Sequence, residues 1–396
     1  MQEQFENENM TEVRVSSEEN VQTPFEGVAF DEEASERARK EAEERARKEE
    51  AKSKLRFAAN RLGWATVILV AVWMGVAWLA SDFVFVLEGF GALDQLSFSS
   101  EAFNNRFALI INELALAVGI AVATLVLTTV QRVELNKEKI SAGRFMKILA
   151  MCFGASYIGN MIGTRILSFW NLMTDNSAGD ELITLLETMD PWMMGISVGI
   201  LAPILEELFF RKFLTERLRV FGERTAILLP AFLFALFHQS AEQIVYAFAV
   251  GIILGYCYCR TGNYWLSVLI HAVFNLVSGV IPVLFLPKIN EFLIEFENVF
   301  VANPEVMDFA ALWEMLQPML ENHGAAIALY ALYSLIILAI NITGLVMILV
   351  SLKKFKARGG EYALTFKESA KVVFKTPGMI VCTVGLGITT LISLFA

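Results

Sequence analysis

Three ionisable side chains lie within one apolar stretch, residues 202–211, which reads A-P-I-L-E-E-L-F-F-R. They are Glu206, Glu207 and Arg211. A charged group near the centre of a bilayer costs about 2.5–3.5 kcal/mol on insertion scales, so an ionisable residue in such a stretch indicates a functional site with a partner.

Helical spacing divides these three charges into a pair and a single group. Glu207 and Arg211 are four residues apart and share one face of a helix, in the order that favours an ion pair. Glu206 points about 140° away from Arg211 and has no such partner. An unpaired, poorly solvated carboxylate suits a general base. Glu206 is therefore the candidate base, and Glu207 the candidate structural partner of Arg211.

Two of the three histidines lie in later apolar stretches. His238 ends the stretch F-A-L-F-H, and His271 shares a helical face with Asn275 in H-A-V-F-N. A lone histidine in a membrane is a hydrogen-bonded core residue about as often as it is a functional one. One shared cavity, however, would satisfy the polar groups of all three segments. The third histidine, His323, lies in a polar loop and is expected at the surface.

Such a cavity could hydrolyse a peptide bond without a covalent intermediate. Glu206 and His238 would hold and deprotonate a water molecule. His271 and Asn275 would donate hydrogen bonds to the oxygen that becomes negative as the water attacks an amide carbonyl. A serine nucleophile is not indicated, because the sequence has no G-x-S-x-G motif and the serines near H-A-V-F-N have no base at helical spacing.

The segments that must position these side chains are typical of membrane-spanning helices. Of the 396 residues, 56% are hydrophobic and 19% are charged, and the mean hydropathy is +0.53, which indicates an integral membrane protein. Apolar runs close to the length of a spanning helix lie at about 62–80, 107–130, 145–171, 192–214, 225–239, 243–259, 263–286, 325–352 and 377–395. We expect an all-α polytopic bundle of about eight to nine spans, in which the short run 225–239 is tilted or half-buried.

A polar arm precedes the bundle. The expected domains are a charged cytoplasmic arm, 1–57, and a membrane domain, 58–396, with its catalytic core at about 191–287. The acidic residues 1–30 predict disorder. The rest of the arm is rich in Ala, Glu, Arg and Lys, which predicts a solvated helix with ion pairs such as Glu36–Lys40 and Glu41–Arg45.

The distribution of basic residues predicts the orientation of the chain. Loops rich in Lys and Arg alternate with acidic loops through every run, which places the arm in the cytoplasm and, with nine spans, the C-terminus outside. The plasma membrane is the expected location. Residues 311–320, A-L-W-E-M-L-Q-P-M-L, predict an amphipathic helix on the surface.

The remaining polar groups and thiols in the spans indicate no second site. Asn112 with Glu113, and Asn160 with Arg165, are expected to form interhelical hydrogen bonds. The four cysteines all lie in apolar runs without a C-x-x-C motif, which predicts neither a disulfide framework nor a metal or redox site.

The three motifs together resemble those of the CAAX protease and bacteriocin-processing (CPBP or Abi) family. These are intramembrane proteases related to the Ras-converting CAAX endopeptidase. E-E-L-F-F-R fits E-E-x-x-x-R, F-A-L-F-H fits F-x-x-x-H and H-A-V-F-N fits H-x-x-x-N, in that order, over about residues 191–287. The resemblance implies that the first glutamate and the F-x-x-x-H histidine activate water, and that H-x-x-x-N forms the oxyanion site. The second glutamate and the arginine would support them. It also implies a membrane-associated or lipidated protein or peptide as substrate, in the lipid bilayer, with no nucleic-acid partner.

Zinc is the alternative to a site without a cofactor. Glu206, His238 and His271 could ligate zinc, as one Glu and two His do in soluble metalloproteases. No H-E-x-x-H motif fixes two ligands on one helical turn. The family has been described as metal-dependent, but its structural resemblance favours a glutamate-based mechanism, and we favour a metal-free site.

Two other functions fit the same pattern of residues. A non-catalytic membrane scaffold or immunity protein could use the same fold to bind partners. A proton-coupled transporter could relay protons through the buried Glu and His, but it would be expected to show inverted repeats with broken helices, and the sequence has no convincing internal symmetry. An endopeptidase accounts for the ordered motifs best.

Overall fold

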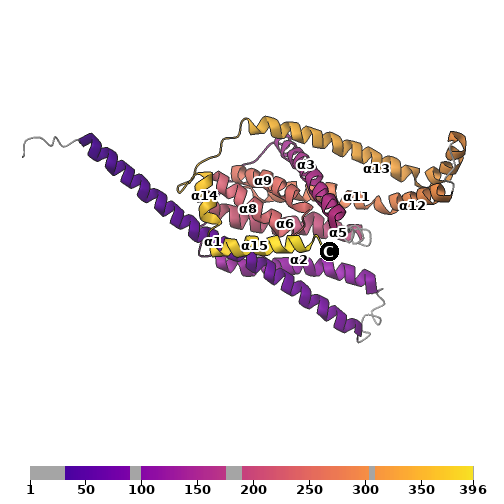
Figure 1. Ribbon diagram of the computed structural model, residues 1–396, viewed down its shortest axis with the longest axis horizontal. Helices are drawn as coiled ribbons and strands as arrows, with labels where there is room; N and C mark the ends of the chain where they lie inside the picture. The colour runs from indigo at the N-terminus through magenta and orange to yellow at the C-terminus, as the bar shows by residue number, and fades with distance from the viewer. Residues whose placement is uncertain (1–31, 90–99, 175–189, 303–307, 396) are drawn as a thin grey trace, which may run out of the picture. The chain divides into compact units, whose positions relative to one another are not determined.

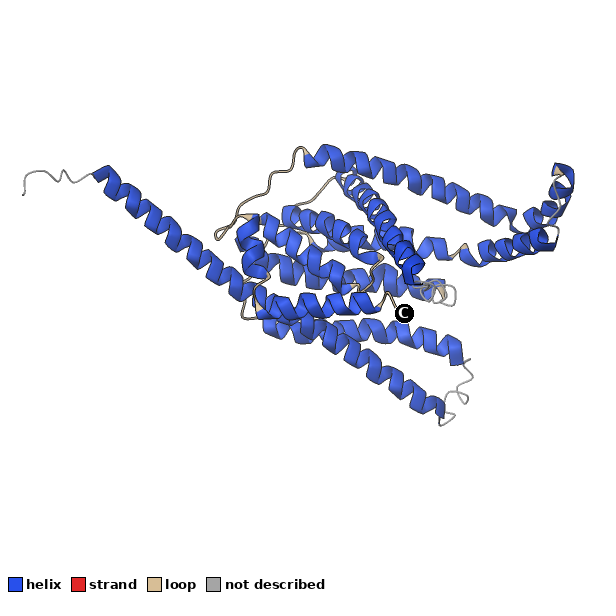
Figure 2. Ribbon diagram, in the orientation of Figure 1, coloured by secondary structure: helices blue, strands red, loops and turns tan. Residues whose placement is uncertain are grey.

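The computed structural model describes residues 32–89, 100–174, 190–302 and 308–395, and all regular secondary structure in these ranges is helical (Figure 2). The chain divides into two compact units, Met1–Ala46 and Arg47–Ala396. The disorder expected for residues 1–30 lies outside the described residues. The fold class predicted from the sequence, an all-α membrane bundle, is confirmed.

Helix α1, Glu32–Gly89, begins in the charged arm and has 58 residues. The two ion pairs expected in the arm are present, because a Glu followed by a basic residue four positions later brings the two side chains onto one face. Glu36 Oε1 lies 2.6 Å from Lys40 Nζ, and Glu41 Oε2 lies 3.6 Å from the Arg45 guanidinium. All four side chains are well exposed, so these pairs support the helix only weakly.

The helices of the larger unit follow one another with few long connections (Figure 1). They are α2 (Ser100–Leu127), α3 (Ala142–Thr174), α5 (Pro191–Ile196), η2 (Ser197–Leu201), α6 (Ala202–Glu207), η3 (Leu208–Thr215), α7 (Glu216–Leu218), η4 (Arg219–Phe221), α8 (Glu223–Phe237), α9 (Gln243–Thr261), α10 (Tyr264–Asn275), η5 (Leu276–Val280), α11 (Ile281–Val283), α12 (Leu286–Ala302), α13 (Phe309–Leu352), α14 (Phe366–Val373) and α15 (Pro377–Ile392). Segments η2, η3 and η5 are π-helical, and η4 is a 3₁₀ turn.

Seven helices of the described residues are long and apolar enough to cross a membrane, and the pair α14–α15, bent by 83°, gives an eighth. The consecutive segments α5 to η4 form one of these spans, and α10 to α12 form another. The count agrees with the eight to nine spans expected. The run that does not qualify is α8, which has only 15 residues.

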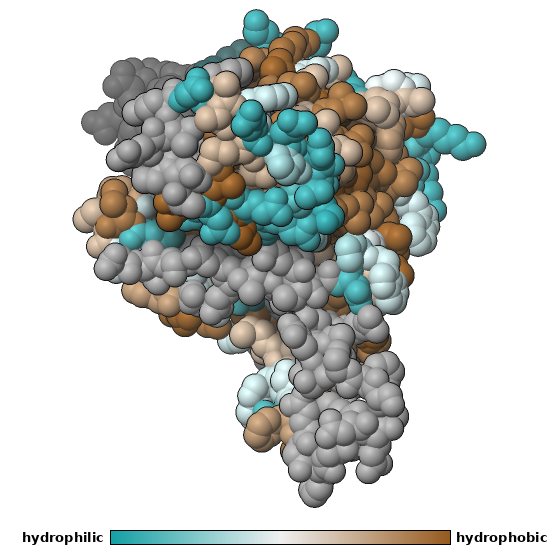
Figure 3. Space-filling view, turned by 90° about the vertical axis from the view of Figure 1, so that its right-hand side faces the viewer, coloured by the Kyte–Doolittle hydropathy of each residue, from teal (hydrophilic) through white to brown (hydrophobic). Residues whose placement is uncertain are grey.

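Large apolar side chains are exposed over much of the molecule, as the brown areas of Figure 3 show for one face. Trp78 is 65% exposed, Phe85 76% and Leu172 81%. A soluble protein rarely exposes contiguous apolar surface of this extent. These side chains face lipid in an integral membrane protein.

Helix α8 lies in the core of the larger unit rather than half-buried at its edge. It packs against α9, η3 and α15, and nearly all of its side chains are buried. It is apolar around its whole circumference after the first turn, which is typical of a helix surrounded by protein. Because neighbouring helices cover it on all sides, α8 does not need the length of a spanning helix.

The structure corrects two expectations for residues 286–323. Residues 311–320 are helical, as expected, but they belong to the 44-residue helix α13, which continues through Pro318, and do not form a separate helix. His323 is only 4% exposed, with Nε2 3.3 Å from Glu295 Oε1 on α12. The polar sequence around His323 suggested a loop, but the helix continues through it and turns His323 toward α12.

Glycines on α3 let this helix approach α9 closely. Gly159 and Gly163 form a G-x-x-x-G motif, in which small residues allow the backbones of two membrane helices to meet. A Cβ atom on Gly163 would lie 2.1 Å from the Glu242 carbonyl oxygen, and one on Gly159 would lie 2.4 Å from the Tyr246 Cα. This contact fixes the start of α9, five residues after His238.

We expect Gly163→Ala to lower the thermal unfolding midpoint of the purified protein, because overpacking a tight contact costs about 1–3 kcal/mol. Gly143→Ala is the matched control, because a Cβ on this glycine of the same helix meets nothing within 4 Å. Equal midpoints for the two variants would contradict the close contact of α3 with α9.

Candidate active site

Three π-helical segments flank the residues that the sequence singled out. Glu206 and Glu207 end α6, between η2 and η3, and Asn275 ends α10, directly before η5. A π-turn widens the helix by one residue and changes which side chains share a face, and such turns are frequent at functional sites. The local geometry of the site therefore departs from regular helical spacing on both sides of the glutamate pair.

Glu207 and Arg211 form an ion pair in the interior. Arg211 Nε donates a hydrogen bond to Glu207 Oε2 at 3.1 Å, and neither side chain is exposed. The guanidinium carbon of Arg211 also lies 5.3 Å from the centre of the Phe234 ring. The electrons of the ring face attract the cation and stabilise it there. Glu207 and Arg211 therefore remain paired, although a π-helical segment begins directly after Glu207 and changes the spacing of side chains.

The other oxygen of Glu207 holds His271. His271 Nδ1 lies 3.2 Å from Glu207 Oε1, and because an ionised carboxylate can only accept, Nδ1 carries the proton. His271 Nε2 faces Glu206. The distance from Nε2 to Glu206 Oε2 is 3.7 Å, which is too long for a hydrogen bond. Glu206 is the more accessible glutamate, with 12% of its side chain exposed compared with none for Glu207.

His238 reaches the same site through Phe234. It follows the last residue of α8, and its Nδ1 donates to the Phe234 carbonyl at 2.9 Å, which leaves Nε2 as the free acceptor of a neutral ring. The Phe234 ring lies 4.7 Å from the His238 ring and 5.8 Å from the His271 ring, measured between centroids. Because α8 ends after 15 residues, His238 follows directly at its end, beside the ring that also contacts His271.

Asn275 lies one turn beyond His271 on α10 and turns toward η2. Its Nδ2 donates to the Val198 carbonyl at 3.0 Å. An amide nitrogen has two N–H donors, so one donor is fixed by η2 and the second is left for another acceptor. Three separate segments thus converge here: the continuous helix η2–α6–η3, the end of α8, and α10.

The described residues do not form a set of ligands for zinc. Among the described residues, no group of three or more His, Cys, Asp and Glu side chains lies in an arrangement that could hold a metal ion. His271 already directs one nitrogen to Glu207, and His238 directs one to a backbone carbonyl. No step below passes through a metal.

One backbone conformation at the site is unusual. Gln239, directly after His238, has φ +50°, and it is the only non-glycine residue with positive φ in the described part of the chain. Left-handed backbone costs a residue with a side chain about 1–2 kcal/mol, and such strain concentrates at functional sites. The turn redirects the chain from His238 into the start of α9.

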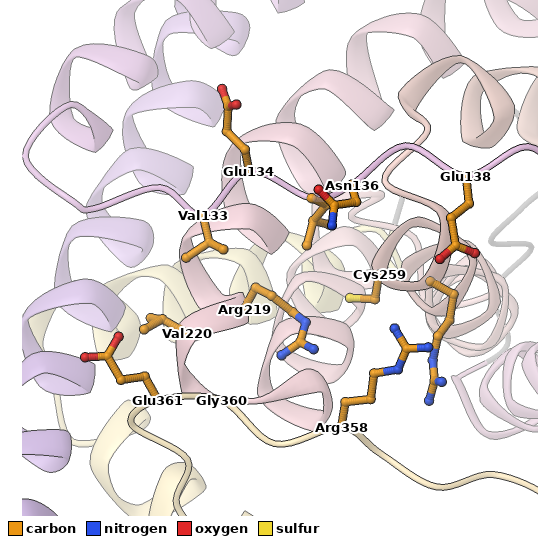
Figure 4. A pocket seen from close by; sticks show the side chains of 12 residues that line it. Val133, Glu134, Asn136, Glu138, Arg219, Val220, Cys259, Arg358, Gly360 and Glu361 are labelled. Carbon is orange, nitrogen blue, oxygen red and sulfur yellow. The ribbon is translucent and has the colours of Figure 1, made fainter.

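A polar cavity of about 380 Å³ lies elsewhere and contains none of the candidate residues (Figure 4). Three arginines and three glutamates line it, so its charges balance. Arg219 donates to the Gly359 carbonyl at 2.9 Å, and Arg260 pairs with the buried Glu223. These contacts tie the connections between helices together and give the cavity no preference for an anion.

Two polar residues outside the three motifs, Glu113 and Ser197, also contact the site. Glu113 on α2 accepts a hydrogen bond from Ser197 Oγ at 2.8 Å, and Ser197 begins η2. An acid within an apolar run was the available signal, and we interpreted it as an interhelical contact. In the sequence, only the four-residue spacing of Phe234 from His238 indicated that Phe234 is buried between the two histidines.

Comparison with known families finds a resemblance over the part of the chain that contains the site. Residues 188–277 match the family described as Rce1-like, Type II CAAX prenyl endopeptidase Rce1-like. We call residues 188–277 the Rce1-like region, after the family that they resemble. It contains all six candidate residues and nearly coincides with the catalytic core expected at 191–287, so the resemblance drawn from the motifs is confirmed. At the level of the family, the match supports a CAAX-type intramembrane protease with a membrane-associated protein substrate. No curated protein and no solved structure matches the chain.

We expect Glu207→Leu alone to destabilise the Rce1-like region strongly, because it leaves Arg211 buried without a counter-charge, which costs about 3–5 kcal/mol. The double variant Glu207→Leu with Arg211→Leu should recover most of the thermal unfolding midpoint, because buried ion pairs can be replaced by apolar residues of similar volume. A double variant no more stable than Glu207→Leu would contradict the pairing.

Proposed function

We propose that this protein is an intramembrane endopeptidase that hydrolyses a peptide bond with water activated by Glu206 and His238. The observation that carries the proposal is that the two glutamates have different partners. Glu207 binds Arg211 and His271, whereas Glu206 has no hydrogen-bond partner in the described residues and its side chain is partly exposed. A free carboxylate beside a fixed imidazole has the arrangement that proton transfer requires.

The first step joins water to the scissile carbonyl. Glu206 takes a proton from the water, and the unprotonated Nε2 of His238 accepts a hydrogen bond that holds the water in place. The water oxygen forms a bond to the carbonyl carbon, and the electrons of the C=O double bond move to its oxygen. The product of this step is a tetrahedral oxyanion.

His271 and Asn275 would stabilise that oxyanion. The free amide N–H of Asn275 is one donor, and the Nε2–H of a protonated His271 is the other, with its Nδ1–H held by Glu207. One such donor is typically worth about 3–4 kcal/mol of barrier lowering. The C–N bond then breaks, and the proton on Glu206 passes to the departing amine, so Glu206 returns to its starting state.

Glu207 and Arg211 act as structural support in this scheme. Arg211 keeps Glu207 ionised and in place, and Glu207 sets which nitrogen of His271 faces the site. The substrate we propose is a membrane-associated or lipidated protein or peptide, because Glu206, His271 and Asn275 lie in helices that are long and apolar enough to span a membrane. A site without metal is proposed on the same residues.

We expect Glu206→Gln and His238→Ala to abolish cleavage of a prenylated fluorogenic peptide ending in a CAAX sequence, by at least about 100-fold in kcat, since general acid–base groups contribute about 10²–10⁴-fold. The assay uses the purified full-length protein in lipid vesicles, and Ser278→Ala is the control, because this hydroxyl contacts only its own helix. Full activity of either catalytic variant would exclude the mechanism and would favour a non-catalytic scaffold.

The same preparation tests the metal-free site. Wild type should keep its activity in the presence of a chelator, and elemental analysis should find less than stoichiometric zinc. Stoichiometric zinc whose removal abolishes cleavage would transfer the catalytic role to a metal.

We also propose that the N-terminal arm is cytoplasmic and that the protein resides in the plasma membrane, supported by the basic residues before the first span. In intact cells a membrane-impermeant maleimide should label Ser100→Cys, at the start of α2 and between the first two spans, but label Ser53→Cys only after permeabilisation. The native cysteines are buried and serve as the unlabelled background. The reverse labelling pattern would invert the orientation.

A further inference from the structure

A buried carboxylate outside the Rce1-like region contacts the site. Glu113 lies on α2, before residues 188–277, and is 6% exposed. The hydrolytic mechanism proposed above makes no use of it.

One oxygen of Glu113 is held by two donors. Ser197 Oγ donates to Oε1 at 2.8 Å, and Asn112 Nδ2 donates to the same oxygen at 3.3 Å. Oε2 is buried and has no partner among the described residues. Asn112 is itself fixed, because Trp73 Nε1 on α1 donates to its Oδ1 at 3.0 Å.

Interhelical adhesion does not account for a carboxylate at this position. A hydrogen bond between membrane helices stabilises their association only weakly, whereas a carboxylate in the middle of a span is costly to insert. A serine or an asparagine would join α2 to η2 at lower cost. A carboxylate that persists at this cost is expected to have a function in the site.

The hydrogen bonds lead from Glu113 to the proposed oxyanion donor. Ser197 is the first residue of the π-segment η2, and the next residue, Val198, supplies the carbonyl that accepts from Asn275 Nδ2 at 3.0 Å. The position of Ser197 therefore sets the position of the Val198 carbonyl. That carbonyl in turn fixes the rotation of the Asn275 amide.

The same cluster supports the opposite side of the site. The Trp73 ring lies 5.1 Å from the Phe237 ring, centroid to centroid, and Phe237 directly precedes His238. Helices α1 and α2 thus hold both the water-activating side and the oxyanion side of the site through one connected group of side chains.

We propose that Glu113 is a positioning residue of the active site, which anchors η2 through Ser197 and thereby orients the Asn275 amide toward the oxyanion. This inference rests on the proposed function. It assigns a role in the reaction to α2, which lies outside the matched region.

The test measures kcat and KM for the prenylated fluorogenic peptide with the full-length protein in vesicles. Ser197→Ala and Glu113→Leu should each lower kcat by roughly 10- to 100-fold with little change in KM, because a misplacement of about 1 Å can cost 10²-fold. Glu113→Gln keeps an oxygen that can accept from Ser197, so it should retain kcat within about three-fold of wild type. Ser278→Ala, with its hydroxyl bound only within its own helix, is the matched serine control.

The decisive arm repeats these substitutions in an Asn275→Ala background. If Glu113 and Ser197 act through Asn275, neither substitution should lower kcat further, because the effects of coupled residues are not additive. A reduction by the same factor in both backgrounds would overturn the inference, as would a Glu113→Gln variant as impaired as Glu113→Leu. Thermal unfolding of every variant separates loss of folding from loss of positioning.

Glu206→Gln in the same assay keeps the two proposals distinct. Cleavage by this variant would overturn the proposed function itself. An inactive Glu206→Gln together with a fully active Ser197→Ala would overturn only the role of Glu113.

Discussion

The site depends on the burial of the Glu207–Arg211 ion pair in an apolar interior. Removing two charges from water costs several kcal/mol for each ion, and their attraction offsets this only when the geometry is good and further contacts satisfy the remaining atoms. Here the Arg211 guanidinium lies against the Phe234 ring and the second oxygen of Glu207 binds His271, whereas Nη1 and Nη2 of Arg211 have no hydrogen-bond partner among the described residues. Each of these further contacts is made by a residue next to the proposed chemistry, so the stability of the pair and the geometry of the site have the same cause.

The π-turns around the site extend this dependence to the backbone. A regular helix through residues 197–215 would present its side chains at even spacing, but η2 and η3 on either side of α6 shift the faces before and after the glutamates. Thr215 Oγ1 donates to the Phe210 carbonyl at 3.0 Å, which satisfies a backbone acceptor within the widened turn. Side chains thus compensate for backbone irregularity that lipid could not.

Local spacing predicted much of this arrangement. The pairing of Glu207 with Arg211 follows from four-residue spacing, and the composition and apolar runs gave the all-helical membrane class. The convergence of His238 with the glutamates was expected from chemistry, but its route was not, because burial of the 15-residue α8 depends on packing by distant helices. His323 was misplaced for a related reason: its polar neighbours describe the local sequence, whereas its burial is decided by α12.

Contacts between segments far apart in the chain were the hardest to foresee. Glu113 and Ser197 are separated by 84 positions, and neither belongs to a motif with a fixed spacing. An acid in an apolar run indicates only that a partner exists, and the partner is chosen by how α2 packs on η2. The motifs therefore indicated the candidate residues of the site, but not the distant side chains that contact them.

The short length of α8 has a consequence for biogenesis. Fifteen residues of helix extend about 22 Å, less than the roughly 30 Å of hydrocarbon in a bilayer, so α8 has no stable transmembrane position as an isolated segment. We expect it to enter the membrane only together with a neighbour, and α9, its most extensive contact, is the natural companion. His238, at the end of α8, then joins the site only when this hairpin has docked. A newly made chain would therefore complete the proposed site only after α8 has docked beside α9.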